Sequence, residues 1–329
     1  MSQDWLLLET MADEPSVLAI GSTPKNMVPI ETFLRRSPNL SILRDAVAHA
    51  KHTGKRLVEE IRSKDRVILV EPVAMDSGDV HGVHMWIGPR REVPPRRPMP
   101  GAWLWNLTTG VVIGTKESLD NGGANPENRQ PGRTFAEDFE HVESNPEETA
   151  AIAKVIESKP GDTFCSTWNG RDYLGNPTRV HFAVRILAER NVDGQPETIA
   201  RAINLRVQPT KSVIEQPQQI ILAQQILAGL AEPGTYRALV DLRTLNLIKW
   251  VDEPMPELDW KYSSDRSSRM HPDDLPVAKA MSDGLAISRT EGILRFRTCV
   301  GTWMPIHVTA HLVLLNQYTT AALVILRES

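Results

Sequence analysis

The chain has 329 residues, of which 24% are charged, and a formal net charge of -4. Because one hydrophobic core stops growing near about 250 to 300 residues, we expect two or three domains. Without a basic surplus, the chain lacks the electrostatic footprint of a nucleic-acid-binding protein. No apolar run approaches the roughly 20 residues of a membrane span, and the N-terminus lacks a signal-peptide pattern. We therefore expect a soluble, cytoplasmic protein with no membrane span.

The two cysteines, Cys165 and Cys299, are far apart in the sequence and fall in no CxxC spacing. Metal and redox sites use such spacings, so neither kind of site is indicated. We expect both cysteines to be buried, inert thiols in a reducing compartment.

The first hundred residues predict short strands at Trp5–Glu9 and Val17–Ile20, followed by a helix over 40–61. Gly54 is expected to weaken this helix, because glycine is unfavourable in a helix interior. Two apolar strands, 66–75 and 80–87, follow. They are joined by Asp76-Ser77-Gly78-Asp79, which is typical of a hairpin turn.

Two segments divide the chain. Residues 88–101, GPRREVPPRRPMPG, are too rich in proline for a helix interior or a sheet, so they predict a linker. Residues 218–231 place Ile220, Ile226 and Leu230 at helical spacing, with glutamines between them. This pattern predicts an amphipathic linker helix over 213–232, which packs on its own domain or pairs with its twin in a dimer.

An internal repeat connects the later parts of the chain. Asn145-Pro146-Glu147-Glu148 and His271-Pro272-Asp273-Asp274 each open a helical pattern, 126 residues apart. Proline and acids in a first helical turn favour a helix start. The same offset aligns the strand 180–187 with 306–313, whereas WNLTTGVV from Trp105 aligns with VDLRTLNL from Val240 at an offset of 135.

Each copy predicts two strands, then helices, then three strands. In the second copy these are residues 237–250, helices from about 255 to 285 with a kink or restart at Pro276, and strands at 294–300, 304–315 and 320–327. The last strand is apolar on both faces, which favours a central position in the sheet.

The HPDD at 271–274, this element order and the hairpin RFRTCVGTWMPIHVTAHL at 295–312 resemble a PAS domain of the HPDD-bearing type over 234–329. A diverged copy with NPEE covers 101–207. The whole chain resembles actinobacterial three-domain PAS/GAF-type sensor proteins without an output domain. The resemblance implies an α+β fold of tandem PAS/GAF-like domains, each a central antiparallel sheet with flanking helices. The implied domains are 1–90 (PAS- or GAF-like), 101–208 (PAS-like) and 233–329 (PAS).

Histidines supply the first candidate site residues. His307 and His311 share one face of a strand, so they could contribute to a metal site, but a polar sheet face or a domain contact is favoured because no acid or cysteine joins them. His81 and His84 are expected on opposite strand faces. His271 could be a haem ligand, but its place in HPDD favours a helix start.

Other chemistry finds little support. The sequence around Cys165, FCSTWNG, lacks the flavin-adduct context, and the acids of PEE and PDD are explained by the helix dipole. No nucleotide-binding, hydrolase or kinase motif is present. No catalytic or metal-binding residue is therefore assigned, cofactor-binding residues stay unknown, and no cofactor is predicted.

The sequence therefore predicts a non-catalytic signalling protein. It acts as an adaptor or sensor through protein–protein contacts, and it has protein partners and forms a homodimer. The alternative is a small-molecule sensor with an apolar ligand in the C-terminal domain. An enzyme is the less favoured class.

Overall fold

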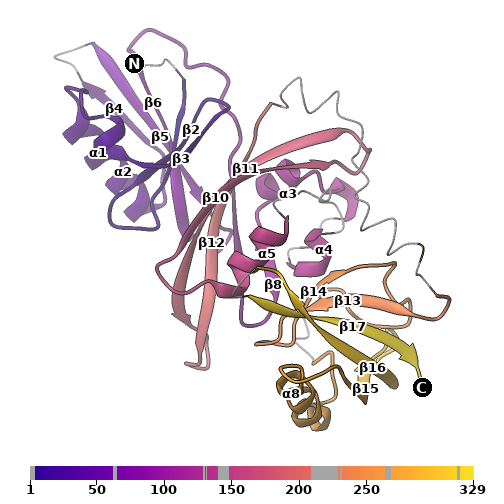
Figure 1. Cartoon of the computed structure of the whole chain (residues 1–329). Coiled ribbons are helices and arrows are strands. Elements are labelled where there is room, and N and C mark those ends of the chain that lie inside the picture. Colours follow the sequence, from indigo (N-terminus) through magenta and orange to yellow (C-terminus); the bar gives the residue numbers. More distant parts are fainter. Residues whose placement is uncertain are drawn as a thin grey trace. The chain divides into compact units, whose positions relative to one another are not determined.

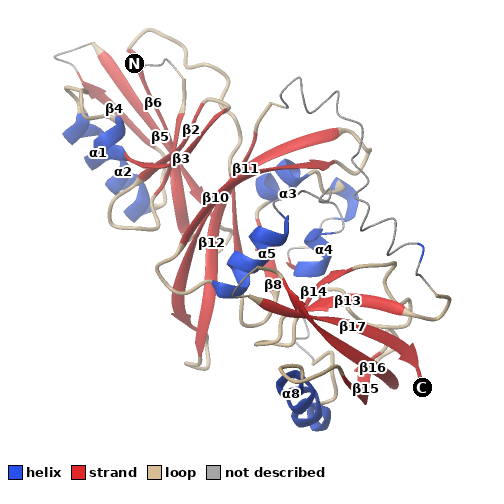
Figure 2. Ribbon diagram, viewed as in Figure 1, coloured by secondary structure: helices blue, strands red, loops and turns tan. Residues whose placement is uncertain are grey.

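The computed structural model describes residues 4–61, 65–128, 130, 132–139, 148–208, 229, 232–263, 268–316 and 319–329. Strands predominate in this part of the chain, as Figure 2 shows, and they form three antiparallel sheets with few and short helices. The expected α+β class is therefore wrong, because the fold is mostly β. No helix in the described ranges is both long and apolar enough to cross a membrane.

The first sheet has the strand order β3-β2-β1-β6-β5-β4. Helices α1 and α2 lie between its strands in the sequence, and α2 packs on one face of the sheet around Leu43 and Val47 (Figure 1). In chain order, the elements are β1 Leu6–Glu9, β2 Ser16–Ile20, β3 Thr23–Pro29, α1 Ile30–Phe33, α2 Leu40–Thr53, β4 Leu57–Ile61, β5 Arg66–Ala74 and β6 Val80–Pro89.

The second sheet has the order β10-β11-β12-β7-β8-β9. Helix α3 is capped at its start by Thr115, whose side chain accepts a hydrogen bond from Ser118 N, and at its end by Gly123 in the left-handed conformation. The elements are β7 Gly101–Asn106, β8 Val111–Gly114, α3 Lys116–Gly122, the 3-10 helix η2 Pro126–Asn128, β9 Gly132–Thr134, α4 Phe135–Phe139, α5 Glu148–Glu157, β10 Thr163–Arg171, β11 Pro177–Arg190 and β12 Pro196–Arg206.

The third sheet has the order β14-β13-β17-β16-β15, so β17 is a central strand, as its two apolar faces predict. The 3-10 turn η3 ends at Asp274 and α8 begins at Leu275, which confirms the restart expected at Pro276. The elements are β13 Tyr236–Val240, β14 Leu247–Trp250, η3 Pro272–Asp274, α8 Leu275–Gly284, β15 Thr290–Arg297, β16 Trp303–Leu314 and β17 Thr320–Glu328.

The three sheets share one strand order. In each sheet the last three strands of the domain run side by side, followed by its first two strands: β4-β5-β6-β1-β2, β10-β11-β12-β7-β8 and β15-β16-β17-β13-β14. The element order expected for the two later copies is therefore confirmed. The first sheet follows the same scheme, so the chain contains three copies of one topological unit.

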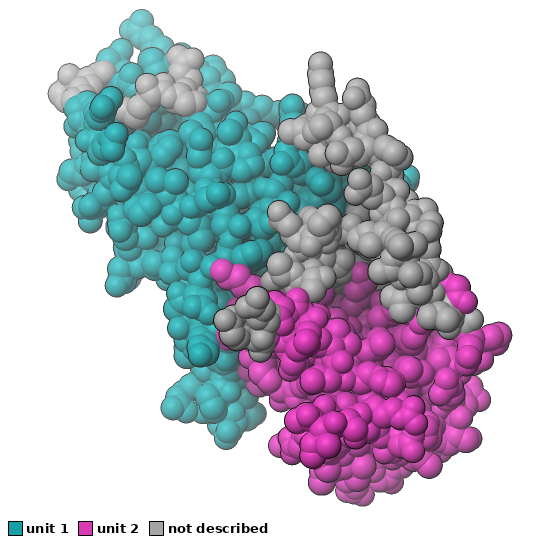
Figure 3. All heavy atoms as spheres, viewed as in Figure 1, with its two compact units in different colours: residues 1–105, 113–131, 159–214 teal, residues 106–112, 132–158, 215–329 magenta. Residues whose placement is uncertain are grey.

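The chain divides into two compact units, which Figure 3 colours separately. Unit 1 comprises residues 1–105, 113–131 and 159–214, and unit 2 comprises residues 106–112, 132–158 and 215–329. The segment that carries β9, α4 and α5 thus belongs to the same unit as the third sheet.

Two helix predictions are wrong in extent. The helix expected over 40–61 ends at Thr53, because Gly54 takes a left-handed conformation and caps it, and β4 follows. Within the described parts of 255–285, the helices expected from 255 begin at 272, and Pro254 and Pro256 disfavour an earlier start. The linker helix expected at 213–232 lies almost entirely outside the described residues.

Candidate functional site

In unit 1, the first two sheets pack against each other through the faces that carry no helix. The apolar part of this junction contains side chains from both sheets: Leu7, Leu18, Ala19, Val73, Met75, Ala102, Ala183, Ile203, Leu205 and Val207. Gly82 allows a close approach of the two sheets, because a Cβ there would lie 2.4 Å from Ile203 Cδ1. The sheets meet along β6 and β12.

Charged side chains enter the same junction. Glu9, at the end of β1, is fully buried, and its Oε1 lies 2.6 Å from Arg185 Nη2 on β11. Its other oxygen, Oε2, accepts a hydrogen bond from Met11 N. Nearby on β12, Arg201 forms two hydrogen bonds with Glu189 and lies 3.6 Å from Asp79. The Glu9–Arg185 and Asp79–Arg201 pairs therefore join the first sheet to the second by charge as well as by apolar packing.

His81 and His84 both face this junction, so the expectation of opposite strand faces is wrong. A β-bulge is the reason: Val73 pairs with Gly82 and Ala74 pairs with Val80, which leaves His81 as the extra residue. His81 Nδ1 donates to the Ala202 carbonyl oxygen at 2.9 Å. His84 on β6 lies opposite Leu7 on β1, and the centroid of its ring lies 5.1 Å from that of the Trp5 ring.

Burial keeps these histidines neutral. Desolvation lowers the pKa of His84 to about 3, and Arg97 adds to the effect. Burial also lowers the pKa of His81. Among the described residues, neither ring nitrogen of His84 has a hydrogen-bond partner.

Cys165 and His181 form a second polar group on the second sheet. His181 Nε2 lies 3.5 Å from Cys165 Sγ and 3.2 Å from the Lys25 carbonyl oxygen, while its Nδ1 lies 2.8 Å from Thr167 Oγ1. Burial raises the pKa of the Cys165 thiol to about 11 and lowers the pKa of His181. A nucleophilic cysteine needs a lowered pKa, so this pair favours a neutral, structural contact.

In unit 2, the HPDD segment connects the start of α8 to strand β15. The His271 side chain accepts from Asp273 N, which confirms the helix-start prediction. The acid Asp274 does more than complement a helix dipole: its carboxylate accepts from Arg295 N, Nε and Nη2 at 2.7, 3.0 and 2.6 Å. The hydrogen bonds from Arg295 lower the pKa of Asp274 to about 2.

Exposed apolar side chains occur on the two elements that this segment connects, the start of α8 and the β15–β16 hairpin. Trp303, at the start of β16, is 40% exposed and its ring lies 4.9 Å from that of His271. Val300, in the β15–β16 turn, is 84% exposed, and the first turn of α8 exposes Leu275 and Val277. We call Leu275, Val277, Val300 and Trp303 the hairpin surface. Cys299 in the same turn is exposed, so the expectation of a buried thiol there is wrong.

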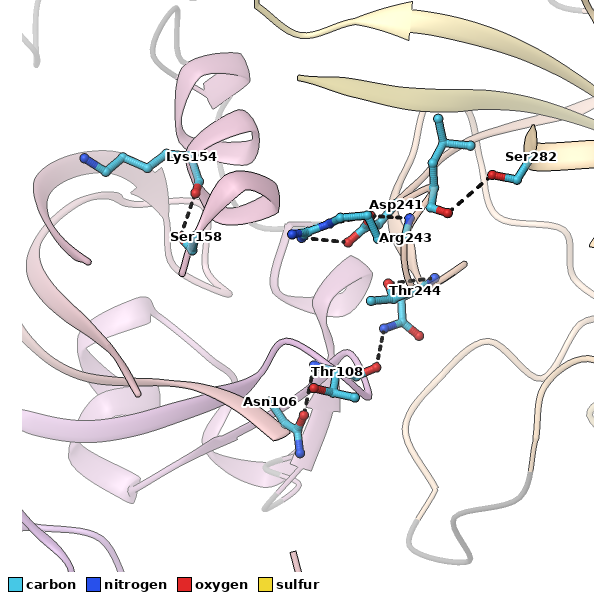
Figure 4. A network of polar contacts seen from close by, with 10 residues as sticks. Asn106, Thr108, Lys154, Ser158, Asp241, Arg243, Thr244 and Ser282 are labelled. Carbon is cyan, nitrogen blue, oxygen red and sulfur yellow. Dashed lines mark hydrogen bonds and ion pairs between the residues drawn. The ribbon is translucent and has the colours of Figure 1, made fainter. Parts of the chain in front are cut away.

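Unit 2 also brings together two equivalent turns of the repeat. Asn106 Oδ1 accepts from Thr108 N and Thr109 N, and Asp241 Oδ1 accepts from Arg243 N. Figure 4 shows the network in which these turns take part. The turns touch where Asn246 Nδ2 donates to the Thr108 carbonyl oxygen at 3.2 Å.

Large side chains fill the space beside the third sheet. Met255 is fully buried, and Trp250 and Trp260 meet edge to face with ring centroids 6.0 Å apart. Ala136 of α4 inserts into the same core. This filling counts against the alternative of an apolar ligand in the C-terminal domain.

His307 and His311 lie half-buried on β16, on the face that points away from this core. No group of three or more His, Cys, Asp or Glu side chains is placed to hold a metal ion in the described part of the chain. Sequence reasoning missed the Glu9–Arg185 pair and the hairpin surface. The only signal for the latter was the apolar turn VGTW inside the hairpin.

Comparison with known proteins gives a family. The Rv3651-like family models match residues 4–96 (N-terminal), 99–207 (middle domain) and 220–329 (C-terminal domain). The crystal structure of an uncharacterised protein from Mycobacterium tuberculosis is 42% identical, has a TM-score of 0.87, and is matched over 100% of this chain and 97% of that chain. No curated protein matches the chain.

Two further structures are similar only weakly. A sensory box histidine kinase/response regulator from Burkholderia thailandensis E264 has 18% identity and a TM-score of 0.26, with 40% of this chain and 90% of that chain covered. An RNA-binding light-oxygen-voltage receptor has 9% identity and a TM-score of 0.25, with 69% and 95% covered. At these scores neither supports an argument about fold or function.

The family matches overturn the PAS/GAF assignment made from HPDD and the element order. The HPDD segment is a local helix start in which Asp274 accepts hydrogen bonds from Arg295 of β15. Such a start is not restricted to one family. The three matches together span nearly all of the sequence. The chain belongs to the Rv3651-like family.

Proposed function

We propose that the protein is a non-catalytic adaptor in signalling, which binds another protein through the hairpin surface of its C-terminal domain. The observation that carries the proposal is the exposure of Trp303, whose ring contacts His271 of the HPDD segment, and of Val300 in the same β15–β16 hairpin. Tryptophan is enriched among the residues that dominate binding energy at protein interfaces.

The surface is also held rigidly, which favours binding. Asp274 fixes the start of α8 to β15 through three hydrogen bonds with Arg295, and His271 packs edge-on against Trp303. A preorganised surface loses less conformational entropy on binding than a loose one. The proposal places the protein in the cytoplasm, and two unpaired cysteines support a reducing compartment.

The test is affinity capture with immobilised full-length protein from an extract of the source organism. Trp303→Ala should lose captured proteins that the unmodified chain retains, because the substitution removes the central aromatic contact. Tyr173→Ala is the matched control, since Tyr173 is 50% exposed in the β10–β11 turn of unit 1 and is not part of the hairpin surface. Identical sets of captured proteins from all three forms would contradict the proposal.

A further inference from the structure

The proline-rich segment after β6 is extended. From residue 93 to residue 100 the chain forms no helix, strand or turn, and half of these residues are prolines. Proline fixes φ at about −65° and keeps the residue before it extended, so this composition favours the polyproline II conformation. The end of the segment is anchored where Asn121 Nδ2 donates to the Met99 carbonyl oxygen at 2.9 Å. We call residues 93–99 the strap.

Trp5, directly before β1, holds the middle of the strap. Its Nε1 donates to the Pro95 carbonyl oxygen at 2.9 Å, and the Arg97 guanidinium lies 5.9 Å from the centroid of its ring. A guanidinium at this distance from a tryptophan ring makes a favourable cation–π contact. Proline-rich ligands dock in aromatic-lined grooves in a similar way, with a preformed extended backbone against the rings. The strap therefore contacts Trp5 as such a ligand would.

Two further rings lie on the same face of the first sheet as Trp5. Val83 and Met85 of β6 belong to the core on which α2 packs, so His84 and Trp86 face the opposite side. The His84 ring centroid lies 5.1 Å from that of Trp5, and Trp86 is buried two residues further along β6. We call Trp5, His84 and Trp86 the aromatic patch.

The strap is held on this patch by few contacts. Residues 93–98 belong to no helix or strand, and the hydrogen bond from Trp5 to Pro95 fixes their backbone. Val93 is 85% exposed. His84 is fully buried, yet neither of its ring nitrogens has a hydrogen-bond partner among the residues that the structure describes. Such a strap opens at a low free-energy cost, and a ligand that also bonds His84 would make a contact that the strap does not make.

We propose that the aromatic patch is a binding site for a proline-rich segment of another protein, and that the strap is its intramolecular competitor. The strap keeps the site closed until a segment of higher affinity displaces it. A competitor tethered to the same chain acts at an effective concentration on the order of millimolar, so weak ligands are excluded. The patch lies in unit 1 and the hairpin surface in unit 2, so this inference goes beyond the adaptor function and does not depend on it.

Peptide binding by the full chain tests the proposal. The probe is a peptide with the sequence of residues 92–100, EVPPRRPMP, titrated by calorimetry. One variant, the loosened chain, combines Pro94→Gly, Pro95→Gly and Arg97→Ala, which remove the stiffness of the strap and its cation–π contact. It should bind the peptide about tenfold more tightly than the unmodified chain, whose own strap competes. Arg96→Ala is the matched control, because Arg96 is an exposed arginine of the same strap and should leave the affinity unchanged.

Two further comparisons show whether the patch and the prolines matter. Trp5→Phe, added to the loosened chain, keeps a ring but removes the indole donor, so the peptide should bind about fivefold more weakly. A peptide with alanine in place of each proline keeps both arginines and should bind at least tenfold more weakly, because it is not preformed as polyproline II.

A loosened chain that binds no peptide would overturn the proposal, and so would equal binding of the alanine peptide or an affinity that Trp5→Phe leaves unchanged. Circular dichroism shows whether the loosened chain keeps its fold. If it does not, Arg97→Ala alone replaces it, since this side chain contacts the ring from a segment without helix or strand. The same outcomes then decide.

Discussion

Leu245 holds in the β13–β14 turn the position that Gly110 holds in the β7–β8 turn, and both have positive φ, +59° and +73°. The two turns are equivalent in the repeat, 135 residues apart. Gly110 adopts the left-handed conformation without strain because it has no Cβ. Leu245 adopts the same conformation although it has a Cβ. Asn246, the next residue, donates to the Thr108 carbonyl of the other turn.

The first prediction follows from this pair. Gly110→Ala should lower the free energy of unfolding by about 1–2 kcal/mol, because a Cβ disfavours the left-handed conformation. The new Cβ would also lie 3.0 Å from Asn246 Cγ, so the contact between the turns should loosen. Urea unfolding monitored by tryptophan fluorescence measures the change.

Gly122→Ala is the control for this substitution. Gly122 ends α3 with ordinary φ, and nothing lies within 4 Å of its Cβ position. Its stability should stay close to that of the unmodified chain. Equal midpoints for the two variants would show that the positive φ of Gly110 contributes nothing.

The second prediction concerns the buried ion pair of unit 1. Glu9→Ala should lower the free energy of unfolding by about 3 kcal/mol, because it leaves Arg185 charged and unpaired at a buried junction. Glu31→Ala is the control. Its partner Arg44 is also 2.6 Å away, but the pair is exposed, so the loss should stay below about 1 kcal/mol.

A double variant separates pairing from packing. Glu9→Leu combined with Arg185→Met removes both charges and keeps apolar volume, so it should recover most of the stability lost in Glu9→Ala. A double variant no more stable than Glu9→Ala would mean that the charge pair is not the source of the loss.

The repeat made much of the fold predictable from the sequence. The alignment of His181 with His307 placed β11 and β16 correctly, and the apolar β17 was correctly made a central strand. Local signals such as Asp76-Ser77-Gly78-Asp79 also gave the β5–β6 hairpin. These features depend on short-range patterns that the sequence shows directly.

The sites were harder to predict because they depend on contacts far apart in the chain. Glu9 and Arg185 are 176 residues apart, and no local pattern pairs them. The bulge at His81 adds one residue to a strand whose side chains otherwise alternate between the two faces. His81 and His84 therefore lie on the same face, and not on opposite faces as predicted. Family assignment from HPDD failed because a helix start is a local feature.

The third prediction is a loss of stability in mild acid. Burial lowers the pKa of His84 from 6.5 to about 3, so the unfolded chain binds more protons than the folded chain between these values. The free energy of unfolding is therefore highest above pH 6.5 and should fall as the pH drops toward 3. His81 and His181, whose pKa values burial also lowers, add to the effect with the same sign.

His84→Phe isolates one histidine. It should reduce the stability lost between about pH 7.5 and pH 5 by about 2 kcal/mol, because one titrating group is gone. Urea unfolding at the two pH values measures the difference, with His49→Gln, an exposed residue of α2, as the control for removing a histidine. An unchanged loss in His84→Phe would exclude His84 as a source of the acid sensitivity.

The segment that carries β9 and α4 contacts the residues beside the third sheet through Glu137 of α4. Glu137 Oε2 accepts from Thr134 N, Thr134 Oγ1 and Tyr262 N at 2.7, 3.1 and 2.9 Å. Gly132 lies under the Tyr262 ring, and a Cβ there would be 2.3 Å from Tyr262 Cζ. The family models assign 99–207 to the middle domain, yet this piece of it completes a neighbouring core.

Glu137→Ala should therefore expose the residues on which α4 packs. The Tyr262 amide loses its acceptor, and Ala136 is less firmly held in the core that contains Trp250, so amide hydrogen exchange over 248–263 should become faster. Gly132→Ala should act in the same direction, because the Tyr262 ring must move to admit the methyl group. Glu127→Ala, at an exposed position of η2, should leave exchange in 248–263 unchanged. If all three variants exchange alike, α4 does not stabilise the third sheet, and that core is complete without it.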